Sequence, residues 1–273
     1  MKKRLLSILL KIILLVFALC FFIPVYITII NAFKTTDDIT NSFLSFSFSP
    51  TFENLKYALL NPNINVYTMY LNSFIITSLG TIFCLLFSGM FAFYIVRRKN
   101  RLAKLLYVYF IIGLMIPYTM IYLPLVLIYK NIGLIGNIYG LIIFSISGNI
   151  SFSVFVYYNF MKALPKELEE AARVDGAGWI SQFFLVVFPL LKPCTAAIGI
   201  FVALSIWNDF SMALIIGRVP TITLGVYSAI GPYFSNWGYV FAFTFLSIFP
   251  IFIAYIVFQK QFMDGIMSGA IKG

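Results

Sequence analysis

Acidic side chains that could recognise a charged partner are concentrated in one stretch, Lys162–Pro193 (KALPKELEEAARVDGAGWISQFFLVVFPLLKP). It holds Glu167, Glu169, Glu170 and Asp175, and it separates two strongly apolar segments. Acidic residues in the first turn of a helix are stabilised by the positive end of the helix dipole. The stretch is therefore typical of a helix that presents charge to a partner in water.

Catalytic chemistry has little support in the rest of the chain. There is no histidine, which removes the commonest proton shuttle and metal ligand. Cys20, Cys84 and Cys194 lie in apolar segments, and we interpret them as packing residues rather than as a disulfide or a metal site. The phosphate-binding pattern G-x-x-x-x-G-K-[ST] is absent. We therefore expect no ATP hydrolysis, no enzyme activity, no cofactor and no metal in this chain.

The composition indicates an all-α polytopic membrane protein, because 62% of the 273 residues are hydrophobic and only 10% are charged. Soluble domains carry about 25% charged residues. A membrane span needs about 20 apolar residues. The first span follows Met1-Lys2-Lys3-Arg4; its apolar run is too long for a signal peptide and no small-residue cleavage site follows, so we expect a retained helix. The six expected spans are residues 8–31, 69–95, 104–129, 134–160, 194–216 and 238–258.

The distribution of Lys and Arg predicts the orientation of the chain. With the N-terminus inside, the outer segments hold only four of the 19 cations, Lys34, Lys56, Lys130 and Arg218, and the inner segments hold the other fifteen. Both termini and the 162–193 loop are therefore expected in the cytoplasm. The net charge of +10 is interpreted as this topology signal and not as a nucleic-acid surface, because the cations are scattered over separate loops.

The first outer loop, residues 32–68, contains one short amphipathic helix, predicted over Phe52–Leu60 with Thr51 as its N-cap. It either lies on the membrane surface and its neighbours or contacts an external partner.

Several spans carry polar residues. In the second span Asn72, Ser73, Thr77, Ser78 and Thr81 either join helices or line a passage. Pro117 and Pro124 predict a kink in the third span. The fourth span has one polar, inward face, and Asp209 in the fifth is the only intramembrane charge apart from Lys11. The polar residues of the fourth span are Ser145, Ser147, Gly148, Asn149, Ser151, Ser153 and Asn159.

The 162–193 loop itself is predicted to form helix, glycine elbow, helix. Pro165 suits the first turn of the first helix, and Gly176 ends it. The pairs Lys166–Glu170 and Glu169–Arg173 have the i,i+4 spacing of ion pairs. A second, apolar helix runs over Trp179–Phe188, breaks at Pro189, and Pro193 starts the next span. The unit either carries movement from a cytosolic partner into the membrane or is an ordinary hairpin between spans.

The sequence of this loop, together with other segments, resembles a known family. Glu170-Ala171-Ala172, Asp175-Gly176-Ala177 and the later Phe183, Pro189 and Pro193 resemble the EAA motif of ABC importer permeases. Asn72-Ser73, Trp207-Asn208-Asp209-Phe210 and the tail Gln259-Lys260-Gln261-Phe262, Gly265 and Gly269–Gly273 resemble the carbohydrate-importer branch, similar to the six-span maltose-type permease. The resemblance covers the whole chain in order; Phe188 and Ile271 depart from the residues usual at their positions.

The resemblance implies a type I ABC importer fold in a bacterial cytoplasmic (inner) membrane. It also implies two cytosolic ATP-binding subunits that hydrolyse ATP with Mg, a second homologous permease and an extracytoplasmic sugar-binding protein. Residues 1–68 would be an N-terminal helix and loop, 69–262 the core permease domain with the coupling helix at 165–188, and 263–273 a cytoplasmic tail. The residues implied to couple to the ATPase are Glu169, Glu170, Ala171, Ala172, Asp175, Gly176 and Ala177, and those of the tail are Gly269, Ala270, Lys272 and Gly273.

Substrate would pass by hydrogen bonds and aromatic contacts, because sugars are neutral and rich in hydroxyl groups. Asn149, Ser151, Ser153 and Asn208 are the candidates, although the main sugar site can lie in the other permease. Three alternatives remain: an ABC permease for a non-sugar solute such as a glycerophosphate, a secondary carrier working alone, and a membrane scaffold without transport. The carrier is disfavoured because intramembrane charges and a convincing inverted repeat are lacking.

Overall fold

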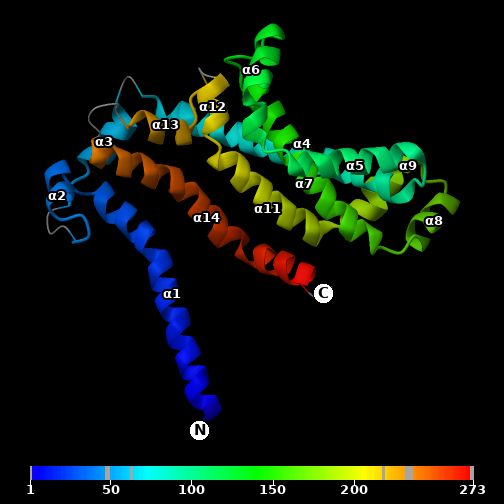
Figure 1. Cartoon of the computed structure of the whole chain (residues 1–273), viewed down its shortest axis with the longest axis horizontal. Coiled ribbons are helices and arrows are strands. Elements are labelled where there is room, and N and C mark those ends of the chain that lie inside the picture. The colour runs from blue at the N-terminus through cyan, green and yellow to red at the C-terminus, as the bar shows by residue number, and fades with distance from the viewer. Residues whose placement is uncertain (1, 47–49, 62–63, 217–218, 231–235, 271–273) are drawn as a thin grey trace. The chain divides into compact units, whose positions relative to one another are not determined.

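The computed structural model describes residues 2–46, 50–61, 64–216, 219–230 and 236–270, and over these residues every regular element is a helix (Figure 1). The chain forms two compact units. Unit 1 comprises Met1–Met69 and Ile222–Pro250, and unit 2 comprises Tyr70–Thr221 and Ile251–Gly273. The all-α prediction is confirmed.

Four helices contain a segment long and apolar enough to cross a membrane. They are α1 (Lys2–Ala32), α4 (Val66–Arg97), α7 (Ile138–Lys162) and α14 (Trp237–Ala270). Two bent pairs raise the number to six if each counts as one span. The first joins α5 (Arg101–Met115) to η1 (Tyr118–Ile121) and α6 (Tyr122–Asn131) at 95°. The second joins Trp179–Leu190 to α11 (Lys192–Asn208) at 83°.

The predicted kink in the third span is confirmed and is a complete break. Helix α5 ends at Met115, and Pro117 is the extended residue that precedes η1. The fifth expected span is also interrupted, because α11 ends at Asn208 and α12 (Ser211–Ile216) starts two residues after Asp209.

In unit 1, α2 (Thr36–Asn41) and α3 (Glu53–Leu60) follow α1, and α13 (Ile222–Ser228) precedes α14. The prediction that Thr51 is the N-cap of α3 is wrong: Phe52 holds that position without a side-chain bond. Thr51 Oγ1 instead accepts from the Glu53 amide at 3.2 Å, outside the helix. The hydroxyl thus still satisfies one amide of the first turn.

Helix α3 packs firmly on its neighbours in unit 1. The buried Asn54 donates from Nδ2 to the Lys34 carbonyl at 2.6 Å. The rings of Tyr57 and Tyr239 stack with their centroids 3.7 Å apart. The Lys34 ammonium is itself buried and donates to the Ser42 carbonyl at 2.7 Å; burial lowers its pKa, which the Asp38 carboxylate partly opposes. The loop is therefore a packed platform rather than an open linker.

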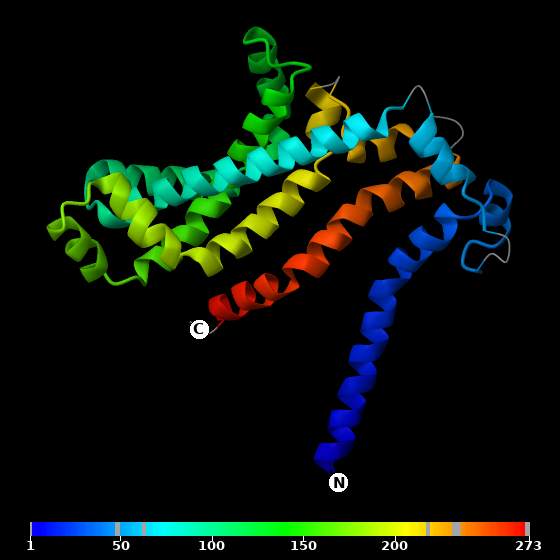
Figure 2. The same cartoon turned by 180° about the vertical axis from the view of Figure 1, so that it is seen from behind.

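The core of unit 2 lies where α4, α7 and α11 meet (Figure 2). Cys84, Met161 and Ile198 are buried there, and the Tyr157 hydroxyl donates to Thr195 Oγ1 at 2.9 Å. Gly80 lies so close to α7 and α11 that a Cβ would come within 3.2 Å of Ser145 and 2.9 Å of Ile206. Small residues bring membrane helices into contact in this way, and this core holds the hairpin described next.

Candidate functional site

The acidic stretch forms a helical hairpin between α7 and α11. Helix α8 (Glu167–Val174) carries three acidic residues in its first turn and Arg173 in its last, which suits the helix dipole at both ends. The prediction that Pro165 opens this helix is wrong, because Lys166 is the N-cap and Pro165 precedes it. Leu164, Pro165 and Lys166 form the connection from α7.

The elbow is a Schellman motif centred on Gly176. Gly176 has φ +87°, a left-handed conformation that favours glycine. Its amide donates to the Arg173 carbonyl at 3.1 Å, and the Ala177 amide donates to the Ala172 carbonyl at 2.9 Å. These two bonds satisfy carbonyls that the helix end would otherwise leave unpaired. The sequence prediction of a glycine stop is confirmed, and the elbow is a defined turn.

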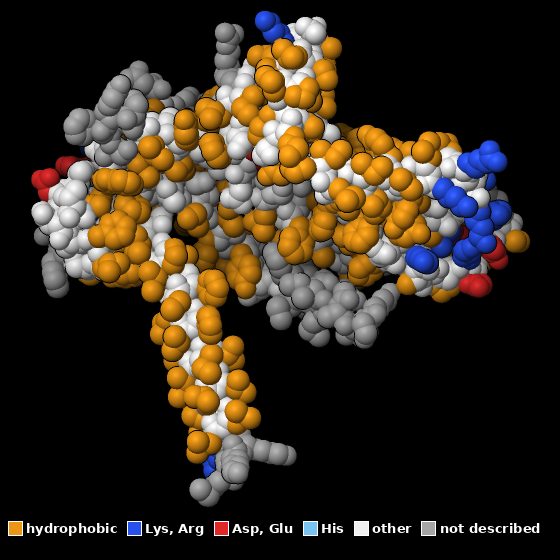
Figure 3. Space-filling model, viewed as in Figure 1, with side chains coloured by type: hydrophobic (Ala, Val, Ile, Leu, Met, Phe, Trp, Pro, Cys, Tyr) orange, Lys and Arg blue, Asp and Glu red, His pale blue; other side chains and the backbone are white. Residues whose placement is uncertain are grey.

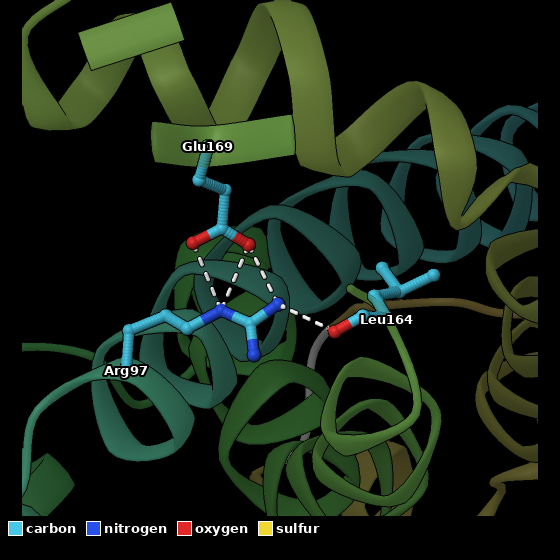
Figure 4. Close-up of polar contacts among 3 residues, drawn as sticks. All are labelled: Arg97, Leu164 and Glu169. Carbon is cyan, nitrogen blue, oxygen red and sulfur yellow. Dashed lines mark hydrogen bonds and ion pairs between the residues drawn. The ribbon is translucent and has the colours of Figure 1, made fainter. Parts of the chain in front are cut away.

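A buried ion pair fixes α8 to the C-terminal end of α4 (Figure 4). Arg97 Nε donates to both carboxylate oxygens of Glu169 at 2.8 and 2.9 Å, and Arg97 Nη2 lies 2.6 Å from Glu169 Oε1. The same Nη2 donates to the Leu164 carbonyl at 3.3 Å. The two side chains are only 6% and 7% exposed. Glu169 therefore has an ion-pair partner within the chain.

This geometry corrects two sequence predictions. Among the described residues, the Arg97–Glu169 contact is the one ion pair within 4 Å, so neither Lys166–Glu170 nor Glu169–Arg173 forms. Glu169 is buried against α4, whereas Arg173, one turn further along α8, is exposed. Spacing along one helix cannot show that a better-placed cation arrives from elsewhere.

The other predicted coupling residues lie mainly on the exposed side of the hairpin. Glu170, Ala171, Asp175 and Gly176 are exposed, while Ala172 and Ala177 are half-buried. Val174 is 88% exposed, which leaves an apolar side chain beside the acidic ones. Figure 3 shows Lys and Arg side chains gathered at the same end of unit 2. The exposed cations of α5, α8 and their flanking residues are Arg98, Lys99, Arg101, Lys104, Lys162, Lys166 and Arg173.

The second half of the hairpin differs from the predicted α-helix. It consists of α9 (Trp179–Ser181), a π-helical stretch η2 (Gln182–Val187) and α10 (Phe188–Leu190). In an α-helix the ring of Pro189 would clash with the carbonyl of Leu185, and a wider turn before the proline relieves that clash. The helix thus continues to Leu190 and does not break at Pro189. Gln182, only 3% exposed, donates from Nε2 to the Ala177 carbonyl at 2.7 Å and braces the elbow.

Helix α4 also contacts this second half. The ring of Phe93 lies 4.4 Å from that of Trp179 and 5.6 Å from that of Phe183, measured between centroids. The Arg98 guanidinium lies 4.7 Å from the centroid of the Trp179 ring, a cation–π geometry. In the sequence, Arg97 and Arg98 are two of the fifteen cations predicted on the inner side, and nothing singles out Phe93. The basic pair at the end of a long apolar helix is the one sequence feature that could have indicated these contacts.

The four candidate pathway residues do not share one surface. Ser153 is fully buried, with Oγ 3.4 Å from Cys84 Sγ of α4. Ser151 points toward α5, where its Oγ would lie 2.5 Å from a Cβ on Gly113. Asn149 is half-buried and Asn208 is exposed; each donates to the carbonyl four residues earlier.

Two further sequence predictions concern the intramembrane charge Asp209 and the C-terminal tail, which both follow α11. Asp209 Oδ1 accepts from the Met212 amide at 3.3 Å, so its carboxylate helps start α12. In the tail, α14 runs to Ala270, and Gly269 and Ala270 belong to its last turn. Lys272 and Gly273 lie outside the described residues.

Comparison with known proteins agrees with this architecture. The chain is 34% identical over 257 residues to the multiple sugar-binding transport system permease protein MsmG of Streptococcus mutans, covering 92% of this chain and 91% of that protein. It is 31% identical over 256 residues to the melibiose/raffinose/stachyose import permease protein MelC of Bacillus subtilis, covering 92% of both.

A solved structure shows the same fold. This is a bacterial ABC transporter involved in the import of the acidic polysaccharide alginate, with a TM-score of 0.81, 23% identity, and coverage of 95% of this chain and 97% of that one. The family model described as "Binding-protein-dependent transport system inner membrane component" matches residues 80–268, which include the whole hairpin. This chain therefore belongs to the family of binding-protein-dependent transport system inner membrane components, which are membrane permeases and not enzymes.

Proposed function

We propose that this chain is one of two permease subunits of an ATP-driven importer for a carbohydrate, and that its α8 hairpin docks the ATP-hydrolysing subunit. The main support for this proposal is the structure of the hairpin. A short helix with exposed Glu170, Ala171 and Val174 ends in a rigid glycine elbow and is tied to the spans by a buried ion pair. Such a helix presents a fixed surface to a cytosolic partner and passes on its movement.

The partners follow from the family. Two cytosolic ATP-binding subunits supply the energy, because the sequence has no phosphate-binding loop. A second homologous permease completes the pathway. An extracytoplasmic binding protein delivers the substrate, and the family description, which calls the transport binding-protein-dependent, supports this partner. The excess of Lys and Arg in the segments around the hairpin supports a cytoplasmic position for the hairpin and both termini in a bacterial membrane.

The substrate class is a neutral oligosaccharide or a sugar derivative. Relatives at 34% and 31% identity carry names that refer to multiple sugars and to melibiose, raffinose and stachyose. Among the candidate pathway residues, the exposed Asn208 and the half-buried Asn149 have the amide groups that hydrogen-bond sugar hydroxyls. Ser151 is a weaker candidate, because it packs toward α5.

The experiment measures uptake of labelled melibiose, raffinose, stachyose and maltotriose in cells that carry the complete transporter, together with retention of the ATPase on the purified permease. We expect uptake of at least one of these sugars. Glu170→Lys places a cation on the docking surface, and Gly176→Pro destroys the elbow, since proline cannot adopt a positive φ. Both variants should lose uptake and ATPase retention while inserting normally.

The matched control is Gly178→Ala. Gly178 lies two residues from Gly176, has φ −68° and has open space around its Cα, so alanine should be tolerated there. Normal uptake and normal ATPase retention in both Glu170→Lys and Gly176→Pro would refute the docking assignment. Uptake of a non-sugar solute with no uptake of any sugar in the panel would refute the carbohydrate assignment.

A further inference from the structure

The C-terminal end of α4 contacts both halves of the α8 hairpin, although 72 residues of chain separate Arg97 from Glu169. We propose that α4 is the route by which movement of α8 enters the membrane, with Arg97 as the positioning residue that joins them. This inference rests on the proposed docking of an ATPase on α8. It assigns to Arg97, which lies outside the EAA motif, a role in energy coupling.

The first contact is directional. Arg97 engages both oxygens of Glu169 and, through Nη2, the carbonyl of Leu164 in the connection that precedes α8. A planar guanidinium that binds a carboxylate through two parallel bonds fixes orientation as well as distance. Both side chains are more than nine-tenths buried, so water screens the attraction little. Helix α8 therefore cannot rotate or shift without either breaking this pair or moving Arg97.

The second contact lies on the other side of the elbow. Phe93, one turn before Arg97, packs against Trp179 and Phe183, and Arg98 lies over the Trp179 ring. Gly89, one turn further back, approaches Phe183 so closely that a Cβ would lie 3.1 Å from its Cζ atom. The last three turns of α4 thus hold the hairpin before and after Gly176, and the hairpin moves with α4 as one body.

The length and continuity of α4 make it a better route than the two covalent connections. It runs 32 residues without an internal proline, which corresponds to about 48 Å at 1.5 Å per residue. By contrast, the link to α7 is the non-helical segment 163–166, and the link to α11 bends by 83°. Near its other end, Asn72 Nδ2 donates to the Pro220 carbonyl at 2.9 Å. A displacement at Arg97 is therefore delivered to the segment that follows α12.

The test is hydrogen–deuterium exchange on the complete purified transporter with and without ATP and vanadate, which traps the closed ATPase. Peptides over 167–174 report α8, and peptides over 89–97 report the end of α4. In the unchanged protein both should respond to ATP and vanadate. In Arg97→Gln and in Glu169→Gln the α8 response should persist, whereas the α4 response should fall at least about threefold, a size typical of lost coupling.

Charge reversal separates transmission from simple damage to the fold. The double variant Arg97→Glu with Glu169→Arg restores an ion pair and should recover the α4 response that either single variant loses. Arg101→Gln is the matched control, because Arg101 is exposed and makes no ion pair within the described part of the chain, and it should respond like the unchanged protein. ATPase retention is measured for every variant.

Two outcomes would overturn the proposal. One is an undiminished α4 response in both single variants, and the other is a double variant that responds no better than they do. If exchange in the α8 peptide does not change with ATP and vanadate even in the unchanged transporter, the docking proposal itself is overturned. The two failures are therefore distinguished by which peptide, α8 or α4, shows no change in exchange.

Discussion

At the scale of single residues, the sequence predicts local conformation well and long-range partners poorly. Gly176 was predictable as a helix stop because the signal, an acidic helix followed by Asp-Gly, is local. Arg97 was not predictable as the partner of Glu169, because the two side chains meet only when α4 and α8 pack together. The i,i+4 rule therefore paired Glu169 with the wrong cation. The exposed positions Glu170 and Ala171 were identified by resemblance to a motif.

Alanine at position 176 should loosen the elbow. The left-handed backbone at φ +87° costs an ordinary residue about 1–2 kcal/mol, which is about 5- to 30-fold in the opening equilibrium. In Gly176→Ala we expect faster exchange of the Ala177 amide, which donates to the Ala172 carbonyl, by about that factor. Gly178→Ala should leave this exchange unchanged. Equal exchange rates in the two variants would show that the elbow tolerates a side chain.

At the scale of elements, the sequence predicts where helices lie but not how each one ends or what register it adopts. The break at Pro117 and the helix–glycine–helix plan of the hairpin were predictable from proline and glycine. The π-helical stretch Gln182–Val187 was not, because an apolar run before a proline fits a kinked α-helix equally well. The start of α3 differed by one residue because Thr51 satisfies the first turn from outside it.

A methyl group at position 238 should disturb the packing of α3 on α14 within unit 1. A Cβ on Gly238 would lie 2.5 Å from Asn54 Oδ1, and Asn54 is held by its bond to the Lys34 carbonyl. Gly238→Ala should lower stability by about 1–3 kcal/mol, as overpacking does, measured by thermal unfolding. Gly148→Ala, which meets no atom within 4 Å, should be neutral or slightly stabilising.

The Asn54→Ala variant tests whether contact with Asn54 causes the loss of stability in Gly238→Ala. Asn54→Ala removes the three side-chain atoms that the new methyl group would meet. In that background, Gly238→Ala should cost little further stability. Additive costs of the two substitutions would mean that the clash is not the source of the effect.

At the scale of the whole molecule, hydropathy predicts how many apolar segments there are but not which of them run straight. Six expected spans became four uninterrupted helices and two bent pairs. The third expected span bends at Pro117, which is the signal for it. The second bent pair instead bends at Leu191, before α11, and the fifth expected span is interrupted after Asn208. Composition alone identifies the class of protein, because a chain with 10% charged residues cannot be an ordinary soluble domain.

The proposed orientation is tested by labelling single cysteines in a variant without Cys20, Cys84 and Cys194. Lys56→Cys and Lys166→Cys both replace exposed side chains, the first on α3 and the second at the start of α8. A membrane-impermeant maleimide should label position 56 in intact cells and position 166 only after the cells are opened. The reverse pattern would invert the predicted topology.

The buried pair of Arg97 and Glu169 also has a consequence for how the chain is made. Arg97 leaves the ribosome first, and α5, α6 and α7 must be inserted before Glu169 can reach it. Until then the guanidinium belongs to the basic run Arg97-Arg98-Lys99-Asn100-Arg101, which helps to hold this loop on one side of the membrane. A buried charge without its partner costs about 3–5 kcal/mol. The pair can therefore close only once α5, α6 and α7 have brought the end of α7 back to the end of α4.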